Sequence, residues 1–171
     1  MGFLKWLGLE AAKDKASVDT ETVRRIAARL ERLPEAQARH LAAFAYVLAR
    51  VAHADLDIED SEAHEMERIV SEVAQLEPDE AVLAVEIAKS QARLLGGTEN
   101  YVVTRQYREL STPEQRVRLL ECLYAVAAAD GIVSNMEDSE IAAIGEELGF
   151  SRPEVIGVRA RWRDHLGVLR K

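Results

Sequence analysis

Two acidic segments of the chain carry carboxylates at a spacing that suits the binding of a divalent cation. Asp55 and Glu62 bracket the first segment, and Asp130 and Glu137 bracket the second at the same spacing. Calcium in proteins takes about six to eight oxygen ligands, whereas magnesium takes a stricter octahedral set and keeps several waters. If each segment curls between two helices, its two carboxylates approach one point. These four acids are therefore the candidate metal ligands, with calcium or magnesium as the favoured ion.

The first segment resembles a known calcium-binding loop only in part. Residues 55–62 hold five carboxylates, interrupted by two apolar side chains. An EF-hand would need glycine where Asp60 stands and a bidentate glutamate where Met66 stands, so this is not an EF-hand. The second segment keeps only its first and last acids and adds Ser134 and Asn135 as neutral oxygen donors.

A purely structural role for the same acids stays open. Asp and Glu near helix N-termini are stabilised by the helix dipole and by backbone N–H groups, with or without a ligand. An acid at the end of one helix and another at the start of the next then only fasten the turn between them. The histidines do not assemble a transition-metal site, and we interpret His53 and His64, beside the first segment, as polar positions on helix surfaces.

The acidic segments belong to a longer repeat with an offset of 75 residues. Laying one copy on the other without a gap aligns apolar and acidic positions together, namely Leu48 with Leu123, Val51 with Val126, Asp55 with Asp130, Glu62 with Glu137, Ile69 with Ile144 and Glu72 with Glu147. Self-similarity of this kind indicates one supersecondary unit used twice. The sequence therefore predicts two halves, at about 34–95 and 112–168, related by an internal pseudo-two-fold axis.

The elements that must position these acids are helices. Apolar residues recur at helical spacing almost throughout, no strand pattern competes, and proline, glycine and capping residues mark the helix ends. Starts are expected at Asp19 or Thr20, Pro34, about Glu59, Pro78, Thr98, Thr112, about Met136 and Ser151, with stops at Gly96, Asp130 and Gly149 and a last helix that carries Trp162 and Leu166. We expect an all-α single-domain bundle of about seven or eight helices over residues 19–171, after an N-terminal tail at 1–18.

Composition limits the functions that the chain can have. Its 171 residues carry a formal net charge of -8, which argues against nucleic acid as a partner and favours a cation or a basic protein. The single cysteine, Cys122, lies in an apolar helical run and reads as a small core residue. No membrane-spanning run, signal peptide or catalytic signature is present, so we expect a cytoplasmic protein that is not an enzyme.

The N-terminal tail offers one further contact. Phe3, Trp6 and Leu7 lie beside a single base, Lys5, in a short stretch that fits an amphipathic helix at the inner face of a membrane or on a partner. The competing interpretation, which we favour, is that this tail packs on the domain or frays.

The two acidic segments resemble the paired motifs of the TerB tellurite-resistance family, whose helical domain also occurs at the N-terminus of DjlA-type co-chaperones. The motif residues are 51–55 followed by Glu62, and 126–131 followed by Glu137; residues 144–151 resemble the run that follows the second motif. The resemblance covers roughly 34–166. It implies an all-helical domain linked to tellurite resistance or metal stress, with a divalent-cation site at Asp55, Glu62, Asp130 and Glu137. Leu56 replaces the glycine of the first motif, and the second loop lacks the usual extra acids, which weakens the expected site.

These observations give two functional hypotheses. In the first, the chain is a non-enzymatic protein of tellurite resistance or metal stress that binds a divalent cation through its acidic helix-loop-helix elbows. In the second, it is an acidic protein–protein interaction scaffold, with or without peripheral membrane contact, that needs no metal or other cofactor. A protein partner is expected in either case, and the sequence does not name that partner, the metal or the oligomeric state.

Overall fold

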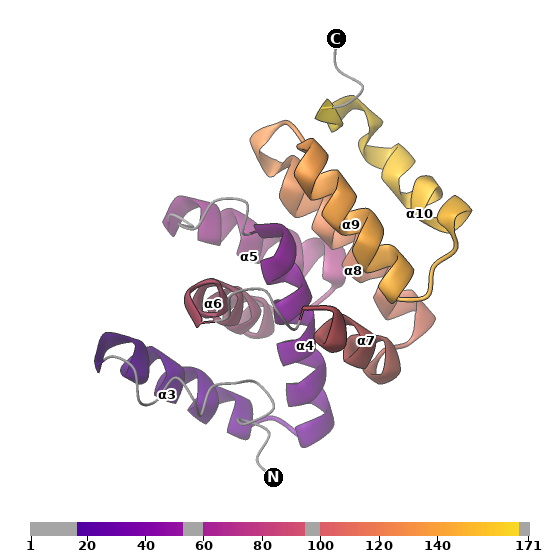
Figure 1. The fold of residues 1–171 in the computed structure, drawn as a ribbon. Coiled ribbons are helices and arrows are strands. Elements are labelled where there is room, and N and C mark those ends of the chain that lie inside the picture. Colours follow the sequence, from indigo (N-terminus) through magenta and orange to yellow (C-terminus); the bar gives the residue numbers. More distant parts are fainter. Residues whose placement is uncertain (1–16, 53–59, 95–99, 168–171) are drawn as a thin grey trace.

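The chain folds into α-helices packed around one long central helix (Figure 1). The computed structural model describes residues 17–52, 60–94 and 100–167. This part of the chain forms 8 helices and no strands, which confirms the all-α fold class and the expected number of helices. The tail residues Phe3, Trp6 and Leu7 lie outside the described residues.

The helices follow one another through short connections. In chain order they are α3 (Ser17–Glu31), α4 (Glu35–Ala52), α5 (Asp60–Ala74), α6 (Pro78–Leu94), α7 (Asn100–Leu110), α8 (Pro113–Ala127), α9 (Asn135–Glu147) and α10 (Arg152–Arg159), with short 3-10 helices η1 (Ala128–Asp130) and η2 (Ala160–His165). The first of them begins at Ser17, slightly before the expected cap at Asp19 or Thr20.

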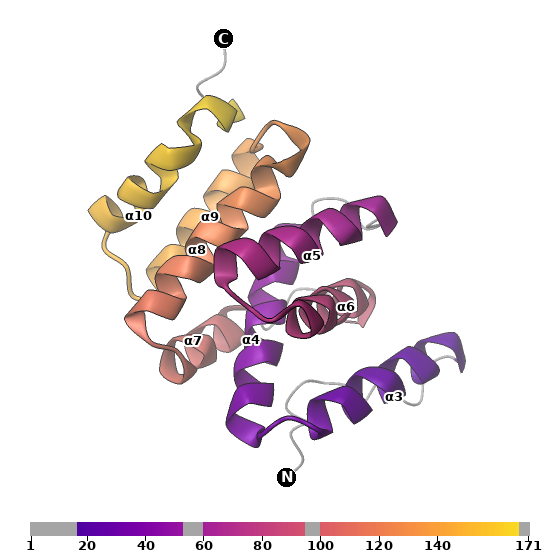
Figure 2. The same ribbon diagram turned by 180° about the vertical axis from the view of Figure 1, so that it is seen from behind.

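Helix α4 lies at the centre because its middle turns carry only apolar side chains, many of them alanine. Every residue from 41 to 49 is buried. The small side chains let other helices approach α4 from several sides: α6 and α7 pack closely along it, and α8 and α9 also contact it. Seen from behind, α5 lies across α8 (Figure 2). A core rich in alanine and aliphatic residues therefore holds helices from both parts of the sequence together.

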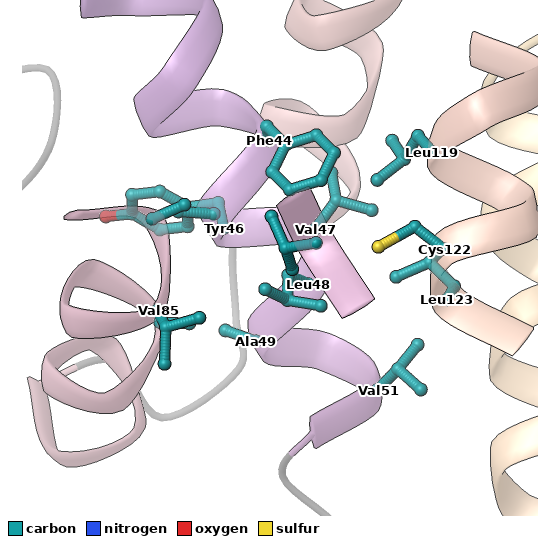
Figure 3. Close-up of a cluster of buried hydrophobic side chains, with 14 of the residues drawn as sticks. Phe44, Tyr46, Val47, Leu48, Ala49, Val51, Val85, Leu119, Cys122 and Leu123 are labelled. Carbon is teal, nitrogen blue, oxygen red and sulfur yellow. The ribbon is translucent and has the colours of Figure 1, made fainter. Parts of the chain in front are cut away.

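Helix α8 adds buried side chains to the core beside α4. In Figure 3, Leu119, Cys122 and Leu123 of α8 face Phe44 and Leu48 of α4. All five side chains are at most 2% exposed. Burial raises the pKa of the Cys122 thiol to about 12, so that it stays protonated at neutral pH. The interpretation of Cys122 as a core residue is confirmed.

Several helix ends follow the local signals in the sequence. Thr112 caps α8 and Ser151 caps α10, each in a capping box with a proline in the first turn. The Ser151 backbone N–H donates to Glu154 at 2.6 Å, and the Glu154 N–H donates to the Ser151 hydroxyl at 3.4 Å. Gly149 has φ of 91° and ends α9, as its position predicted.

The C-terminal helix is shorter than predicted. Helix α10 ends at Arg159, and η2 follows, with non-helical angles at Trp162. The Trp162 ring stacks on Tyr124 at a centroid distance of 5.6 Å, and Leu166 is extended and forms a parallel bridge with Val133. These contacts to α8 and to the turn before α9 are stronger than the local preference for a continuous helix, so the chain bends toward them.

The order of helices agrees with two similar halves, but the internal two-fold relation stays a prediction.

None of the described helices combines the length and hydrophobicity that a bilayer span requires.

Candidate functional site

The structure describes two of the four predicted metal ligands in detail. Glu62 lies in the first turn of α5 with an exposed side chain, and Glu137 lies in the first turn of α9. Asp130 ends η1, but its side chain lies outside the described set, as does the whole of Asp55. Within the part of the chain that the structure describes, no three His, Cys, Asp or Glu residues form a group that could hold a metal ion. The joint site of all four acids stays a prediction.

The second elbow, which we define as residues 128–134, is a tight turn between α8 and α9. The 3-10 helix η1 leads into Gly131, whose φ of 99° lies in the left-handed region that glycine adopts at no steric cost. The Gly131 N–H donates to the Ala128 carbonyl at 2.9 Å and closes the turn. Three residues later Ser134 takes extended angles and caps α9. The loop thus curls between two helices, which is the shape that a cation site at this elbow requires.

Glu137 points back toward the second elbow. One of its carboxylate oxygens, Oε2, accepts the Ser134 backbone N–H at 2.8 Å, and the Glu137 N–H donates to the Ser134 hydroxyl at 3.1 Å. This reciprocal capping box satisfies two N–H groups that the helix itself cannot pair. Glu137 therefore has a structural role at the helix start, which is the alternative that the sequence left open for it.

The C-terminal segment fastens the second elbow from outside. The Val133 N–H donates to the His165 carbonyl at 2.7 Å, and the Gly167 N–H donates to the Val133 carbonyl at 2.9 Å. The His165 ring adds a contact of 3.2 Å between Nδ1 and the Gly131 carbonyl, so this ring nitrogen carries the donated proton. Val133 and Leu166 are both buried beneath these bonds. The backbone of the elbow is consequently held in one conformation.

Asp138, directly after Glu137, is neutralised by an arginine of α10. Arg159 donates to both Asp138 oxygens, from Nε at 2.9 and 3.1 Å and from Nη2 at 2.8 Å. The Tyr124 hydroxyl donates to Asp138 Oδ1 at 3.1 Å. Burial and the nearby Asp138 charge raise the pKa of Tyr124, and the hydrogen bond to Asp138 raises the pKa of Arg159. Asp138 therefore joins α8, α9 and α10 and is committed to the fold.

Two further acids of α9 are paired with an arginine of α4. Arg50 is only 7% exposed in its side chain; its Nε donates to Glu140 at 2.7 Å, and its Nη1 donates to Glu147 at 2.5 Å. Nη1 also donates to the buried Thr104 hydroxyl of α7 at 2.8 Å. One guanidinium thus joins three helices. Two carboxylates of α9 thus share one positive charge inside the protein.

The sequence of this chain matches a known protein family. The family model of the tellurite resistance protein TerB matches residues 40–160, which is more than half of the chain and includes both acidic segments. The chain belongs to the TerB family. No curated protein and no solved structure matches it. The resemblance seen in the two motifs is thereby confirmed, and the chain has a family linked by name to tellurite resistance.

The sequence did not predict the ion pairs that Arg50 and Arg159 form with the acids of α9. Arg50 is the only charged residue in the run 41–52, a position where an isolated charge must find a partner once the helix is buried. The isolated charge of Arg50 therefore indicates a buried ion pair, but it does not identify the acid that is the partner. Arg68 of α5 pairs instead with two acids of its own helix, Glu65 and Glu72, on the exposed face.

The second elbow of the TerB domain also exposes apolar side chains. Ile132 is 45% exposed and Met136 is 77% exposed, one on each side of Ser134. Isolated apolar residues are common on protein surfaces. Beside the acids of the elbow, however, they add contact area that a protein partner would use.

Proposed function

We propose that this TerB-family chain is a non-enzymatic protein of tellurite resistance or metal stress that binds a divalent cation at its acidic elbows. The ligands are Asp55 and Glu62, which bracket the first acidic segment, and Asp130 and Glu137, which bracket the second. Family membership over residues 40–160 supports the link to tellurite resistance. The curled conformation of the second elbow, with Glu137 turned back toward it, is the observation that supports a cation site.

The capping role of Glu137 is compatible with ligation. Its Oε2 accepts the Ser134 N–H, whereas its Oε1 makes no hydrogen bond within the described residues. A carboxylate has about four lone-pair positions, so one oxygen can cap a helix while the other binds an ion. Calcium and magnesium bind oxygen ligands of this kind, and the hydroxyl of Ser134 and the amide oxygen of Asn135 are neutral donors in the same turn.

The decisive experiment is thermal unfolding of chelator-stripped protein titrated with calcium, magnesium, manganese and zinc. A ligand that binds only the folded state stabilises it by an amount that grows with the logarithm of the ligand concentration above Kd, and so raises the melting temperature. We expect calcium or magnesium to raise the melting temperature of the native chain and to leave that of the Asp55→Asn/Asp130→Asn variant unchanged. The control variant Glu77→Gln/Asp79→Asn removes two exposed acids, one just before α6 and one in its first turn, and should respond like the native chain.

A second function is favoured by the exposure of Ile132 and Met136 beside the elbow acids. In this alternative the acidic surface binds a basic protein partner and needs no metal. Association through charge weakens as salt increases, because counterions screen the opposite surfaces. Partner capture that falls with salt, ignores chelator and is lost in Ile132→Ser/Met136→Ser would support the scaffold in place of the cation site.

A further inference from the structure

A second charged site lies at the opposite end of α8 from the second elbow. A cleft of about 260 Å³ is lined by Arg105, Arg108 and Glu109 of α7 and by Arg116 of α8. Three arginines and one glutamate give this cleft a positive charge on a chain whose formal net charge is -8. Basic residues that gather against the overall charge of a protein create a local field that attracts anions.

The turn that carries this cleft is rigid. The Ser111 hydroxyl donates to the Tyr107 carbonyl at 2.6 Å, and Thr112 forms a capping box with Gln115 at the start of α8. Arg116 follows one residue after that box, and its Nε donates to the Thr112 carbonyl at 3.3 Å. This bond orients the guanidinium, and its two Nη groups make no hydrogen bond within the described residues. Arg116 is therefore oriented by its Nε, and its two Nη groups can donate to a ligand.

The Arg108 side chain packs against Gly149, at the C-terminal end of α9. A Cβ built on Gly149 would lie 2.7 Å from Arg108 Cζ, so the guanidinium lies directly against the Gly149 backbone. Arg108 makes no ion pair in the part of the chain that the structure describes. Arg50, Arg68 and Arg159, in contrast, each pair with carboxylates.

Among the residues that line the cleft, arginines outnumber carboxylates. Tyr107, in the same helix α7, is 1% exposed. Burial, followed by the effect of Cys122, raises the pKa of Tyr107, which stays neutral at physiological pH. Glu109 is the single carboxylate that lines the cleft. Arg108 and Arg116, opposed by Glu109 among the lining residues, leave a net positive charge for a ligand.

We propose that this cleft binds a phosphate-class oxyanion, either inorganic phosphate or the phosphate group of a small molecule. Guanidinium groups donate paired hydrogen bonds that match the oxygens of a phosphate, and arginine is the preferred residue for such recognition. The cleft has the volume for one phosphate group with its first waters. Arg108 and Arg116 supply the donors, and Glu109 limits the affinity by repulsion. The site shares no residue with the elbow acids, so it goes beyond the proposed cation function.

Calorimetric titration with sodium phosphate, in chelator and at constant ionic strength set by chloride, tests this proposal. We expect saturable binding by the native chain, and binding weaker by at least about tenfold in Arg108→Gln/Arg116→Gln, because each lost guanidinium removes charge-assisted hydrogen bonds. The charge-matched control Arg24→Gln/Arg32→Gln on and beside α3 should bind as the native chain does. A parallel titration with glycerol 3-phosphate separates the two sources of the group: tighter binding assigns a phosphorylated small molecule, and equal or weaker binding assigns free phosphate.

Because the double variant removes a contact at Gly149, its folding is checked by circular dichroism and urea unfolding. Should it fail to fold, Glu109→Gln on the exposed surface keeps the proposal testable, since removal of the repulsive carboxylate should tighten phosphate binding by about twofold or more. The absence of saturable binding by the native chain, or an equal loss in the α3 control, would overturn the proposal. Chelator excludes divalent cations, so neither result depends on the elbow site.

Discussion

Arg50 of α4 and Glu147 of α9 meet at 2.5 Å although 97 residues separate them in the sequence. The same guanidinium binds Glu140 and the hydroxyl of Thr104, so one buried cation connects α4, α7 and α9. An arginine buried in this way is costly to leave unpaired, and its partners lose their neutralising charge when it is removed. The connection between the two parts of the chain therefore depends on this residue as well as on apolar packing.

Arg50→Met should lower the free energy of unfolding by about 2–4 kcal/mol, because two acids and a buried hydroxyl lose their common partner. Urea unfolding monitored by circular dichroism measures the change. Arg68→Met is the matched control, since Arg68 pairs with the acids of α5 that align with Glu140 and Glu147 but does so in solvent. A loss in the Arg68 variant as large as that in the Arg50 variant would contradict the account of a buried connection.

Gly131→Ala should destabilise the protein by about 1–2 kcal/mol, because an L-residue is strained at a φ of 99°. No atom lies within 4 Å of the added methyl group, so the cost is that of the backbone alone. Gly157→Ala in α10 also meets open space, but at helical angles, and should stabilise by up to about 1 kcal/mol. The melting temperature should fall in Gly131→Ala and rise in Gly157→Ala. Shifts in the same direction would be inconsistent with a left-handed turn at Gly131.

The two roles of Glu137 can be separated by one substitution. Glu137→Gln keeps an acceptor for the Ser134 N–H and should leave metal-free stability within about 0.5 kcal/mol, whereas Ser134→Ala should cost about 1 kcal/mol. If Glu137 also binds a cation, the glutamine variant loses part of the thermal response to calcium or magnesium while its metal-free melting temperature stays unchanged. A full response in Glu137→Gln would remove Glu137 from the ligand set.

His40 should make stability depend on pH. Its Nε2 is buried without a hydrogen-bond partner in the described structure, and its ring lies 5.1 Å from that of Tyr107. Burial lowers the pKa of His40 from its usual 6.5, although the charge of Glu80 opposes this effect. The unfolded chain therefore binds the proton more readily, so stability is fully present above pH 6.5 and falls as the pH drops below it. Urea unfolding between pH 7.5 and 5.5 should show this loss, and His40→Phe should reduce it; an unchanged slope would exclude His40 as its source.

Local signals in the sequence were sufficient for most of the fold. The prolines at positions 78 and 113, the Ser151 capping box and Gly149 each act within one helical turn, and the structure places helix ends at all of them. The alanine-rich run of α4 lies in the core. These features depend on neighbouring residues, which periodicity and capping rules describe well.

Contacts between distant residues were not predictable in the same way. Nothing in the spacing of Arg50 says that its partners lie 90 and 97 residues away. The bend after Arg159 depends on the stacking of Trp162 against Tyr124 and on the bridge from Leu166 to Val133, which only the assembled helices create. The candidate cation site depends on the relative position of four acids, of which the structure describes two in detail, and it therefore needs a direct measurement.

That measurement is calorimetric titration of calcium, and separately of magnesium, into chelator-stripped protein. The proposed elbow site predicts saturable heat of binding in the native chain that is lost in Asp55→Asn/Asp130→Asn and kept in the control Glu77→Gln/Asp79→Asn. No heat in the native chain, or the same heat in all three proteins, would contradict cation binding through these acids and would leave them as residues that fasten the elbows.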